Sequence, residues 1–408
     1  MIKKNFKSKL KKIRLIFYLN AVLKSKILKI RSKYIKKIYE KKLKETQNYY
    51  DKNFSIKNFK KNHFEISPLF TPKKKGDLNI FWVGAHEAQD KSGFLQALRK
   101  FGCVECFKNS NSEYGPLYKA QGLKWLDVRK INDHTLLEQV KKSHKNKKIN
   151  LLFGQMWSHV FSKEALLKIR ELSIPVVNIA MDDKLPELWG YKDNQRLGSV
   201  GLGNGVDMTL TTTIQACQWY SIENMPSLFW PLASDFKLFG KSSNITRDID
   251  ILFIGNRYGI RGKIIDYLFQ NGVNVTCYGN GWPNGPVNAD QNVALSKKAK
   301  IILGVGTIGY CSDVYTLKLR DFDALMTGAL YITHRNPDLL QLFCEGYHLE
   351  CYENENELLE KIKYYLNQPY KRAIIGKQGK KKAKKYHTWE TRIQQTFYEL
   401  DFISEDTF

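Results

Sequence analysis

Two segments of the chain share one pattern, and this repeat constrains the fold more than any other feature. Residues 79–84 (NIFWVG) and 250–255 (DILFIG) are each a short apolar run that ends in glycine and precedes a helical segment. Further apolar runs alternate with helical patterns after each unit, and strands that alternate with helices form parallel sheets. We therefore predict an α/β chain with two successive Rossmann-like domains.

The runs that follow these two units define the expected elements. Strands are predicted at 149–153, 176–180 and 208–211 in the first half, and at 274–277, 300–303, 329–332 and 348–352 in the second. Helices are predicted at 93–99, 162–172, 261–271, 354–367 and 370–385. A chain of 408 residues exceeds the usual single-domain size. The expected units are an extension (1–75) and two domains (76–235 and 236–388), with a hinge near 230–243.

Positive charge gathers at the start of the chain. Residues 1–75 hold 24 of the 66 Lys and Arg residues but 4 of the 40 Asp and Glu residues, so +20 of the net +26 belongs there. Within 8–45, apolar side chains recur three and four positions apart and Lys and Arg fill most other positions, which predicts an amphipathic helix. Residues 46–75, rich in Asn, Lys and Tyr, are predicted as a linker.

A basic helix of this kind has three interpretations. It can lie on an anionic membrane, with Phe17 and Tyr18 among the side chains that enter the interface. It can be a solvated or self-associating extension, or it can bind nucleic acid. We favour the membrane surface through residues 8–45, and nucleic acid is the least favoured because the charge is confined to the appendage.

Cysteine usage and hydropathy bear on the compartment. Seven scattered cysteines suit a reducing environment, and Cys103 and Cys106 form a lone CxxC that we interpret as strand residues. The apolar run 15–23 is shorter than the ~18 residues of a membrane span, and lysines follow it without a signal-peptide cleavage site. We expect a cytoplasmic protein, peripheral at the inner face of the membrane.

Residues 316–343 carry the strongest functional signal. Lys318 and Arg320 can meet phosphates, Asp323 can accept hydrogen bonds from ribose hydroxyls, and Gly328 ends the helix before a strand. The segment resembles the donor-binding signature of GT-B glycosyltransferases, in which an acid precedes Ala-x-x-x-Gly, a strand and Pro-[Asp/Glu]-Leu. It is most similar to the CgeB-like branch, and the resemblance extends in order and spacing from residue 250 to residue 392.

The resemblance implies two facing Rossmann-like domains, in which the second holds a nucleotide-sugar and the first holds the acceptor. It also implies that the last segment, 389–408, crosses back onto the first domain. Related retaining enzymes have two acids eight residues apart, of which Asp323 occupies the second position. The first position holds Tyr315, and this departure bears on the identity of the sugar and on the stereochemistry.

The donor site is expected beyond the carboxyl ends of the strands, where open parallel sheets bind ligands. Glycine lets the backbone approach a phosphate, and a helix N-terminus offers free N–H groups. An ordinary turn with exposed arginines and packed loop aromatics is the alternative. The candidate donor-binding residues are Gly255, Asn256, Arg257, Arg261, Tyr278, Trp282, Thr316, Lys318, Arg320 and Asp323.

Candidate catalytic residues lie in the first domain. Asp183 ends a strand in an Asp-Asp pair and can serve as a base, or it can cap a helix. His86 follows the first strand and can orient an acceptor hydroxyl, or it can be an ordinary loop residue. Asp248 and Asp250 spell a metal-binding DxD but precede a strand instead of following it, so we predict no essential metal and no cofactor.

We therefore predict a metal-independent, retaining glycosyltransferase. Its partners would be a nucleotide-sugar donor and a surface glycan, lipid-linked or protein acceptor. The alternative is a non-catalytic GT-B-like protein that binds glycans or assembles on a cell or spore surface. Tyr315 favours the alternative, whereas the retained cations and Asp323 favour the enzyme.

Overall fold

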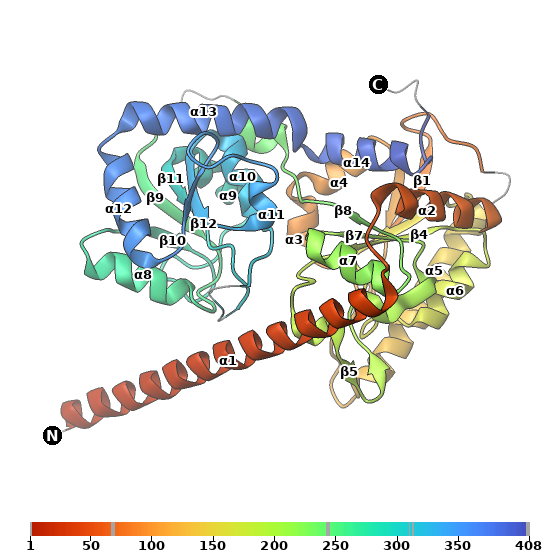
Figure 1. Ribbon diagram of the computed structural model, residues 1–408, viewed down its shortest axis with the longest axis horizontal. Helices are drawn as coiled ribbons and strands as arrows, with labels where there is room; N and C mark the ends of the chain where they lie inside the picture. The colour runs from red at the N-terminus through yellow and green to blue at the C-terminus, as the bar shows by residue number, and fades with distance from the viewer. Residues whose placement is uncertain (1, 67–69, 242–244, 310, 312–313, 405–408) are drawn as a thin grey trace.

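Two parallel sheets, one in each half of the chain, form the frame of the molecule (Figure 1). The computed structural model describes residues 2–66, 70–241, 245–309, 311 and 314–404, and the side chains of all of these except 2–21, 64 and 66. The predicted membrane-facing side chains Phe17 and Tyr18, and the last residue of the predicted hinge, Ser243, lie outside this description.

The N-terminal sheet has six parallel strands in the order β2-β1-β3-β4-β7-β8. Ile80 of β1 pairs with Val104 of β2 on one side and with Leu151 of β3 on the other. The strands are β1 (Leu78–Val83), β2 (Gly102–Cys106), β3 (Leu151–Gly154), β4 (Val176–Ala180), β7 (Met208–Thr211) and β8 (Ser227–Phe229). A small antiparallel hairpin, β5 (Tyr191–Lys192) and β6 (Gln195–Arg196), lies outside this sheet.

Helices and helical turns connect these strands. Ser162 caps α6 by accepting a hydrogen bond from the backbone N–H of Ala165, as a capping serine at an N-terminus does. The elements are α3 (Glu87–Gln89), η1 (Asp90–Phe94), α4 (Leu95–Leu98), α5 (Trp125–Asn146), α6 (Lys163–Arg170), η2 (Pro186–Trp189), η3 (Ser199–Gly205) and α7 (Ile214–Ile222).

The C-terminal sheet has five parallel strands in the order β10-β9-β11-β12-β13. The strands are β9 (Ile249–Ile254), β10 (Thr276–Tyr278), β11 (Ala299–Leu303), β12 (Leu330–His334) and β13 (Glu350–Tyr352). The helices are η4 (Phe236–Gly240), α8 (Arg261–Gln270), α9 (Ala289–Lys298), α10 (Leu319–Thr327), α11 (Pro337–Leu340), α12 (Glu355–Leu366), α13 (Pro369–Tyr386) and α14 (Trp389–Glu399).

The predicted fold class, two Rossmann-like α/β domains, is confirmed. Several elements were not predicted, namely β8, α5, α7 and α9. α5 escapes a periodicity search because it buries few apolar side chains, among them Val128, Leu136 and Val140, in 22 otherwise mostly polar residues. β8 has three residues, which is too short to show a strand pattern.

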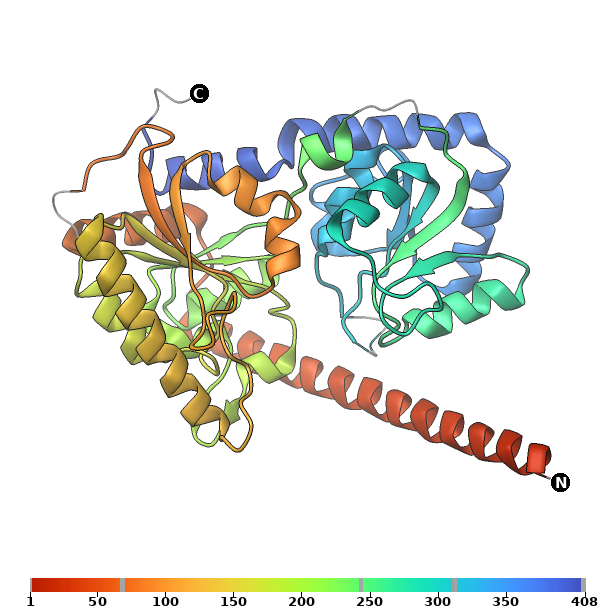
Figure 2. The same cartoon turned by 180° about the vertical axis from the view of Figure 1, so that it is seen from behind.

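The N-terminal extension is a long helix, α1 (Ile2–Thr46), and the helix predicted within it is confirmed. It runs beneath the C-terminal domain and ends on the N-terminal domain (Figures 1 and 2). Tyr39 is 2% exposed, donates a hydrogen bond to Glu223 (2.5 Å) and stacks on Trp219. Leu28 packs, together with Leu185 of the first domain, against a small apolar cluster of the second domain that contains Ile308.

The linker predicted at 46–75 needs a correction, because it contains the helix α2 (Lys52–Ile66). Phe59 is fully buried in the apolar core of the N-terminal domain. Its ring contacts that of Phe402 at the end of the chain, with 5.7 Å between the centroids. Burial of such an aromatic side chain contributes on the order of 2 kcal/mol, which a segment full of Asn and Lys did not suggest.

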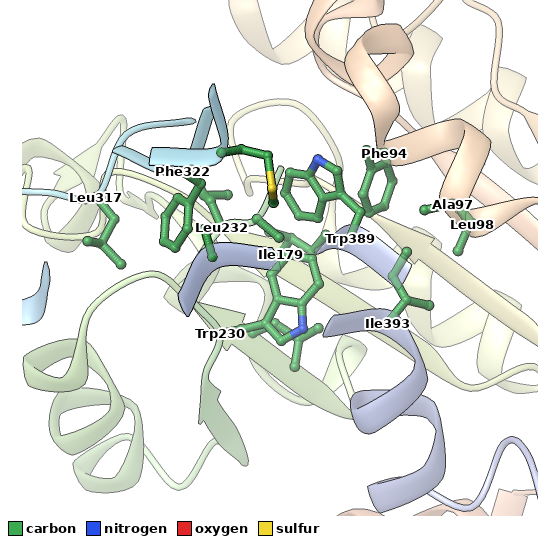
Figure 3. Close-up of a cluster of buried hydrophobic side chains, with 14 of the residues drawn as sticks. Phe94, Ala97, Leu98, Ile179, Trp230, Leu232, Leu317, Phe322, Trp389 and Ile393 are labelled. Atoms are coloured by element: carbon green, nitrogen blue, oxygen red, sulfur yellow. The ribbon is translucent and has the colours of Figure 1, made fainter. Parts of the chain in front are cut away.

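One apolar cluster connects the two domains (Figure 3). Trp230, after β8, and Trp389, at the start of α14, lie 5.8 Å apart between ring centroids. Trp389 also contacts Phe94 of the N-terminal domain, and Trp230 donates a hydrogen bond to Thr396 of α14 (2.8 Å). α14 therefore leaves the second domain and packs on the first, close to the connection between them.

Candidate functional site

Two guanidinium groups converge on the turn after β9. Gly255 has φ +155°, and a Cβ built there would lie 2.5 Å from Nη2 of Arg320 and 3.3 Å from Nη1 of Arg261. Arg320 donates through Nε to the carbonyl of Ile254 (2.9 Å) and stacks over Phe253. Burial, and then the positive charge of Arg320, lowers the pKa of Arg261 to about 10. The pair is a concentration of positive charge at the carboxyl end of the sheet.

The start of α10 brings a third cation to the space between the domains. Asp321 accepts a hydrogen bond from the backbone N–H of Lys318 (2.7 Å), which fixes the first turn. The side chain of Lys318 then reaches the carboxylate of Asp182 in the N-terminal domain, 3.0 Å away. Gly328, with φ +78°, ends the helix in the left-handed conformation, as predicted.

Asp323 follows Lys318 by five residues in α10 and is 6% exposed. It accepts a hydrogen bond from Ser234 of the interdomain connection (2.7 Å). Burial raises its pKa to about 8, against the effects of Ser234 and Arg320. Asp323 and Arg320 line one cavity of about 160 Å³, together with Leu252, Ile254, Asn292, Ser296, Ile302, Leu319 and Ala324.

The other residues predicted after β9 and β10 do not share this cavity. Nη2 of Arg257 donates to both carboxylate oxygens of Asp266 (2.7 and 2.9 Å), and the guanidinium group stacks over Trp282. Trp282 is 7% exposed and donates to the carbonyl of Gly255 (2.7 Å), so it belongs to the core and is not available to stack on a base. Asn256 accepts from the backbone N–H of Asn280, and Tyr278 is half-buried. Of Arg257, Lys318 and Asp323, only Asp323 therefore lines this cavity.

The predicted base Asp183 also needs a correction. Its side chain is buried at 1% exposure, where it accepts hydrogen bonds from Thr211 (2.6 Å) and Tyr220 (3.1 Å). Burial raises its pKa to about 7. The preceding residue, Asp182, adopts a left-handed φ of +57° and turns its carboxylate toward Lys318. Asp182, which the sequence analysis did not select, is the acid that faces the other domain.

The turn after β1 holds His86 and a second acid. His86 caps α3 by accepting from the backbone N–H of Gln89 (3.4 Å), which is the ordinary structural role. Asp90, mentioned by no site prediction, is 2% exposed and accepts hydrogen bonds from Tyr114 (2.6 Å) and Trp82 (3.3 Å). Burial raises the pKa of Asp90 to about 6 despite these hydrogen bonds.

A second ion pair joins the domains beside the first. Lys184 lies 2.7 Å from Asp338 of α11, and both side chains are largely buried. Thr316, a predicted donor residue, is 1% exposed, and its backbone N–H donates to Gly306 (3.0 Å). Tyr315 lies beside the ring of His334, with 6.1 Å between the centroids. The segment before α10 is thus packed against the loop after β11.

No predicted residue forms a metal centre. Within the part of the chain that the structure describes, no three His, Cys, Asp or Glu side chains are grouped as a metal site would need. Asp248 and Asp250 lie at the amino end of β9 and pair with Lys298 and Lys300, far from the turn at its other end. Cys103 and Cys106 are free thiols of β2.

None of the helices whose placement is known is both long enough and apolar enough to cross a membrane.

Residues 261–397 match the family described as glycosyl transferase-like. No curated protein matches the sequence. The fold is similar to that of sucrose-phosphate synthase from Thermosynechococcus elongatus (TM-score 0.55, 12% identity, 78% of this chain and 97% of that one). It is also similar to Anabaena HepE in complex with UDP and glucose (TM-score 0.54, 13% identity, 78% and 98%).

A third similar structure is AviGT4, a glycosyltransferase involved in avilamycin A biosynthesis (TM-score 0.50, 9% identity, 79% of this chain and 97% of that one). At these identities the solved structures establish the fold, and membership of the CgeB-like branch stays a prediction. The chain has the two-domain GT-B fold of glycosyltransferases, and its C-terminal half carries the glycosyl transferase-like family pattern over residues 261–397.

Proposed function

We propose that this protein is a glycosyltransferase whose C-terminal domain holds a nucleoside diphosphate sugar. The observation that carries the proposal is the convergence of Arg261 and Arg320 on Gly255. A diphosphate there would meet two guanidinium groups and the N-terminus of α8. Nη1 of Arg320 is buried and has no hydrogen-bond partner in the described part of the chain, so an incoming phosphate oxygen would supply the missing acceptor.

The cavity beside Arg320 suits the nucleoside. Asp323 lines this cavity, and its carboxyl group can accept hydrogen bonds from ribose hydroxyls if the hydrogen bond from Ser234 is broken. HepE has been solved with UDP and glucose, which makes UDP the first nucleotide to test. Trp282 has no part in this site, and Tyr278 remains as the aromatic candidate beside the base.

The chemistry needs the departing diphosphate to be stabilised. Transfer breaks the bond between the anomeric carbon and the diphosphate oxygen, and it forms a bond from that carbon to an acceptor hydroxyl oxygen. Lys318, Arg261 and Arg320 would offset the charge that develops on the diphosphate, in the role that a divalent ion has in other transferases. We propose attack on the same face of the sugar, with retention, the acceptor proton passing to the departing phosphate oxygen.

The acceptor would enter from the N-terminal domain, where Asp182 faces the donor side and His86 lies in the turn after β1. We propose a surface glycan, a lipid-linked glycan or a protein as acceptor, and an enzyme that works at a membrane surface. Leu23, Ile27, Ile30 and Tyr34 follow one another along α1 at intervals of three and four residues and are between 41% and 67% exposed among lysines. Such a helix fits an anionic lipid interface.

Co-sedimentation with vesicles tests the membrane part. Wild type should sediment with phosphatidylglycerol vesicles and stay in solution with phosphatidylcholine. The double variant Leu23→Glu and Ile30→Glu should stay in solution even with phosphatidylglycerol vesicles. Sedimentation without any vesicles would instead identify α1 as a self-association helix.

A non-catalytic GT-B protein is the second candidate, and Tyr315 at the position of the first acid favours it. Thermal-shift measurements with UDP, GDP, TDP and CDP separate the two, because a scaffold should be stabilised by none of them. The enzyme should be stabilised by one.

The decisive test measures nucleoside diphosphate release with a panel of sugar donors. Arg261→Ala should lower release about 100-fold, since it removes a charge that meets the leaving group. Arg257→Ala is the matched control, because that guanidinium is already paired with Asp266, and it should stay within about threefold of wild type. Equal losses in the two variants would contradict the assignment of the donor site.

A further inference from the structure

A cationic cavity lies at the end of the C-terminal sheet opposite the proposed donor site. It has a volume of about 330 Å³. β9, β11 and β12 begin beside it, whereas the donor-site cations lie where strands end. Half of its lining residues are basic and none is acidic: Arg247, Lys300, Thr327, Gly328, Leu330, Pro369, Arg372, Ala373, Lys377 and Lys380.

The hydrogen bonds that hold the two arginines go to backbone carbonyls, and among the described residues neither arginine forms an ion pair with a carboxylate, although the charge of Asp250 acts on Arg372. Arg247 donates to the carbonyls of Lys297 (3.1 Å) and Thr327 (2.9 Å), at the ends of α9 and α10. Arg372 donates to the carbonyl of Tyr365 (2.6 Å) at the end of α12. Carbonyl oxygens orient a guanidinium group without cancelling its charge, so both arginines bring positive charge to the cavity in fixed positions.

The lysines add charge that is only partly balanced. Lys300 pairs with Asp250. Lys377 and Lys380 have no ion-pair or hydrogen-bond partner among the residues that the structure describes. Burial, and then the charges of Arg247, Lys297 and Lys384, lowers the pKa of Lys380. Burial, and then the charge of Arg372, lowers the pKa of Arg247. A bound anion would relieve this repulsion.

We propose that this cavity is a second anion site, which binds a small soluble ligand carrying phosphate groups. Its volume lies at the small end of the range for ligand pockets. A lipid headgroup fits less well, because α13 lies on the side of the C-terminal domain opposite α1, the basic helix (Figures 1 and 2).

The site is separate from the donor site but joined to it by one helix. Lys318 and Arg320 lie at the first turn of α10, whereas Thr327 and Gly328 at its end line the cavity. Nine residues of helix span about 14 Å. A ligand in the cavity therefore contacts the end of the same helix whose beginning meets the donor.

Footprinting of lysines in the full-length wild type tests the proposal. Brief acetylation, read by mass spectrometry, compares Lys377 and Lys380 with the exposed Lys363 and Lys381 of the same molecule. Pyrophosphate should slow acetylation of the first pair about threefold or more and leave the second pair unchanged. Equal protection of all four lysines, or of none, would overturn the proposal. Protection by phosphatidylglycerol vesicles in place of pyrophosphate would overturn the assignment to a soluble ligand.

Titration calorimetry gives an independent readout at constant ionic strength. The double variant Lys377→Ala and Lys380→Ala should bind one pyrophosphate fewer per chain than the control variant Lys363→Ala and Lys381→Ala, which has the same net charge. Both pairs are at or near the surface, so both variants should fold. Equal stoichiometry in the two variants would refute the site.

Discussion

In the N-terminal domain the turn after β1 packs against a carboxylate, whereas in the C-terminal domain the turn after β9 packs against two guanidinium groups. A Cβ at Gly84 would lie 2.1 Å from the hydroxyl of Tyr114 and 2.3 Å from Oδ2 of Asp90. At Gly255 the nearest atom would be Nη2 of Arg320, at 2.5 Å. The same strand–glycine–helix pattern thus supports opposite electrostatics in the two halves.

This difference is the reason that we place the proposed diphosphate site in only one of the two domains. Asp90 is enclosed by Trp82 and Tyr114, which donate to it, so the first turn has no charge to offer an anion. Arg320 keeps an unpartnered buried nitrogen within the described residues. Fold symmetry therefore does not imply functional symmetry, because the side chains that enter each turn come from elsewhere in the chain.

One methyl group added to each turn tests the comparison most directly. Gly255→Ala should displace the Arg320 side chain and strain a backbone at φ +155°, which would weaken nucleotide binding about tenfold. Gly84→Ala should destabilise the fold by about 1–3 kcal/mol, because Tyr114, Asp90 and Trp82 must shift together. Nucleotide titration and chemical unfolding of both variants measure the two effects.

The two variants serve as controls for each other. Gly84→Ala should leave nucleotide affinity unchanged at temperatures where it is folded. If Gly84→Ala weakened nucleotide binding as much as Gly255→Ala, the two turns would not have separate roles and the comparison would fail.

A smaller effect is expected where the two domains meet. Lys318→Met removes the cation that contacts Asp182 and should lower donor turnover about fivefold, since it also removes one of the three charges that we propose near the leaving group. Asp182→Asn should lower donor turnover less than Lys318→Met does. The double variant should resemble Lys318→Met alone, because contacting residues are not additive. Strict additivity in kcat/KM would show that this interdomain pair is unimportant for turnover.

Sequence patterns predicted the sheets well because buried parallel strands are short apolar runs. β9 and the glycine after it were evident, whereas β8, with three residues, gave no periodic signal. α2 was missed because a few buried aromatics such as Phe59 hold a segment whose composition is that of a linker. Tertiary burial, and not local propensity, decides such cases.

The site was predicted less completely, because the direction of a side chain depends on partners distant in sequence. Arg257 and Arg261 are four residues apart in the sequence, yet Arg257 turns to Asp266 while Arg261 lies near Arg320. Asp182 and Asp183 are neighbours, and nothing local tells which one is buried. Only the left-handed φ of Asp182 in the structure separates them.

A further effect should appear in the pH dependence of the first turn. Burial raises the pKa of Asp90 from 3.8 to about 6, so the native state holds this proton more tightly than the unfolded chain. The contribution of Asp90 to the free energy of unfolding is therefore greatest below pH 4. It falls as the pH rises toward 6 and is constant above that pH. Asp90→Asn should remove this fall, on the order of 2 kcal/mol, when unfolding is compared between pH 4 and 7. The second turn should contribute no such change of unfolding free energy between pH 4 and 7, because Arg261, with a pKa of about 10, stays charged over this range. If the unfolding free energy of Asp90→Asn changed with pH as that of wild type does, the titrating group would be another residue. The contrast between the two turns would then be lost.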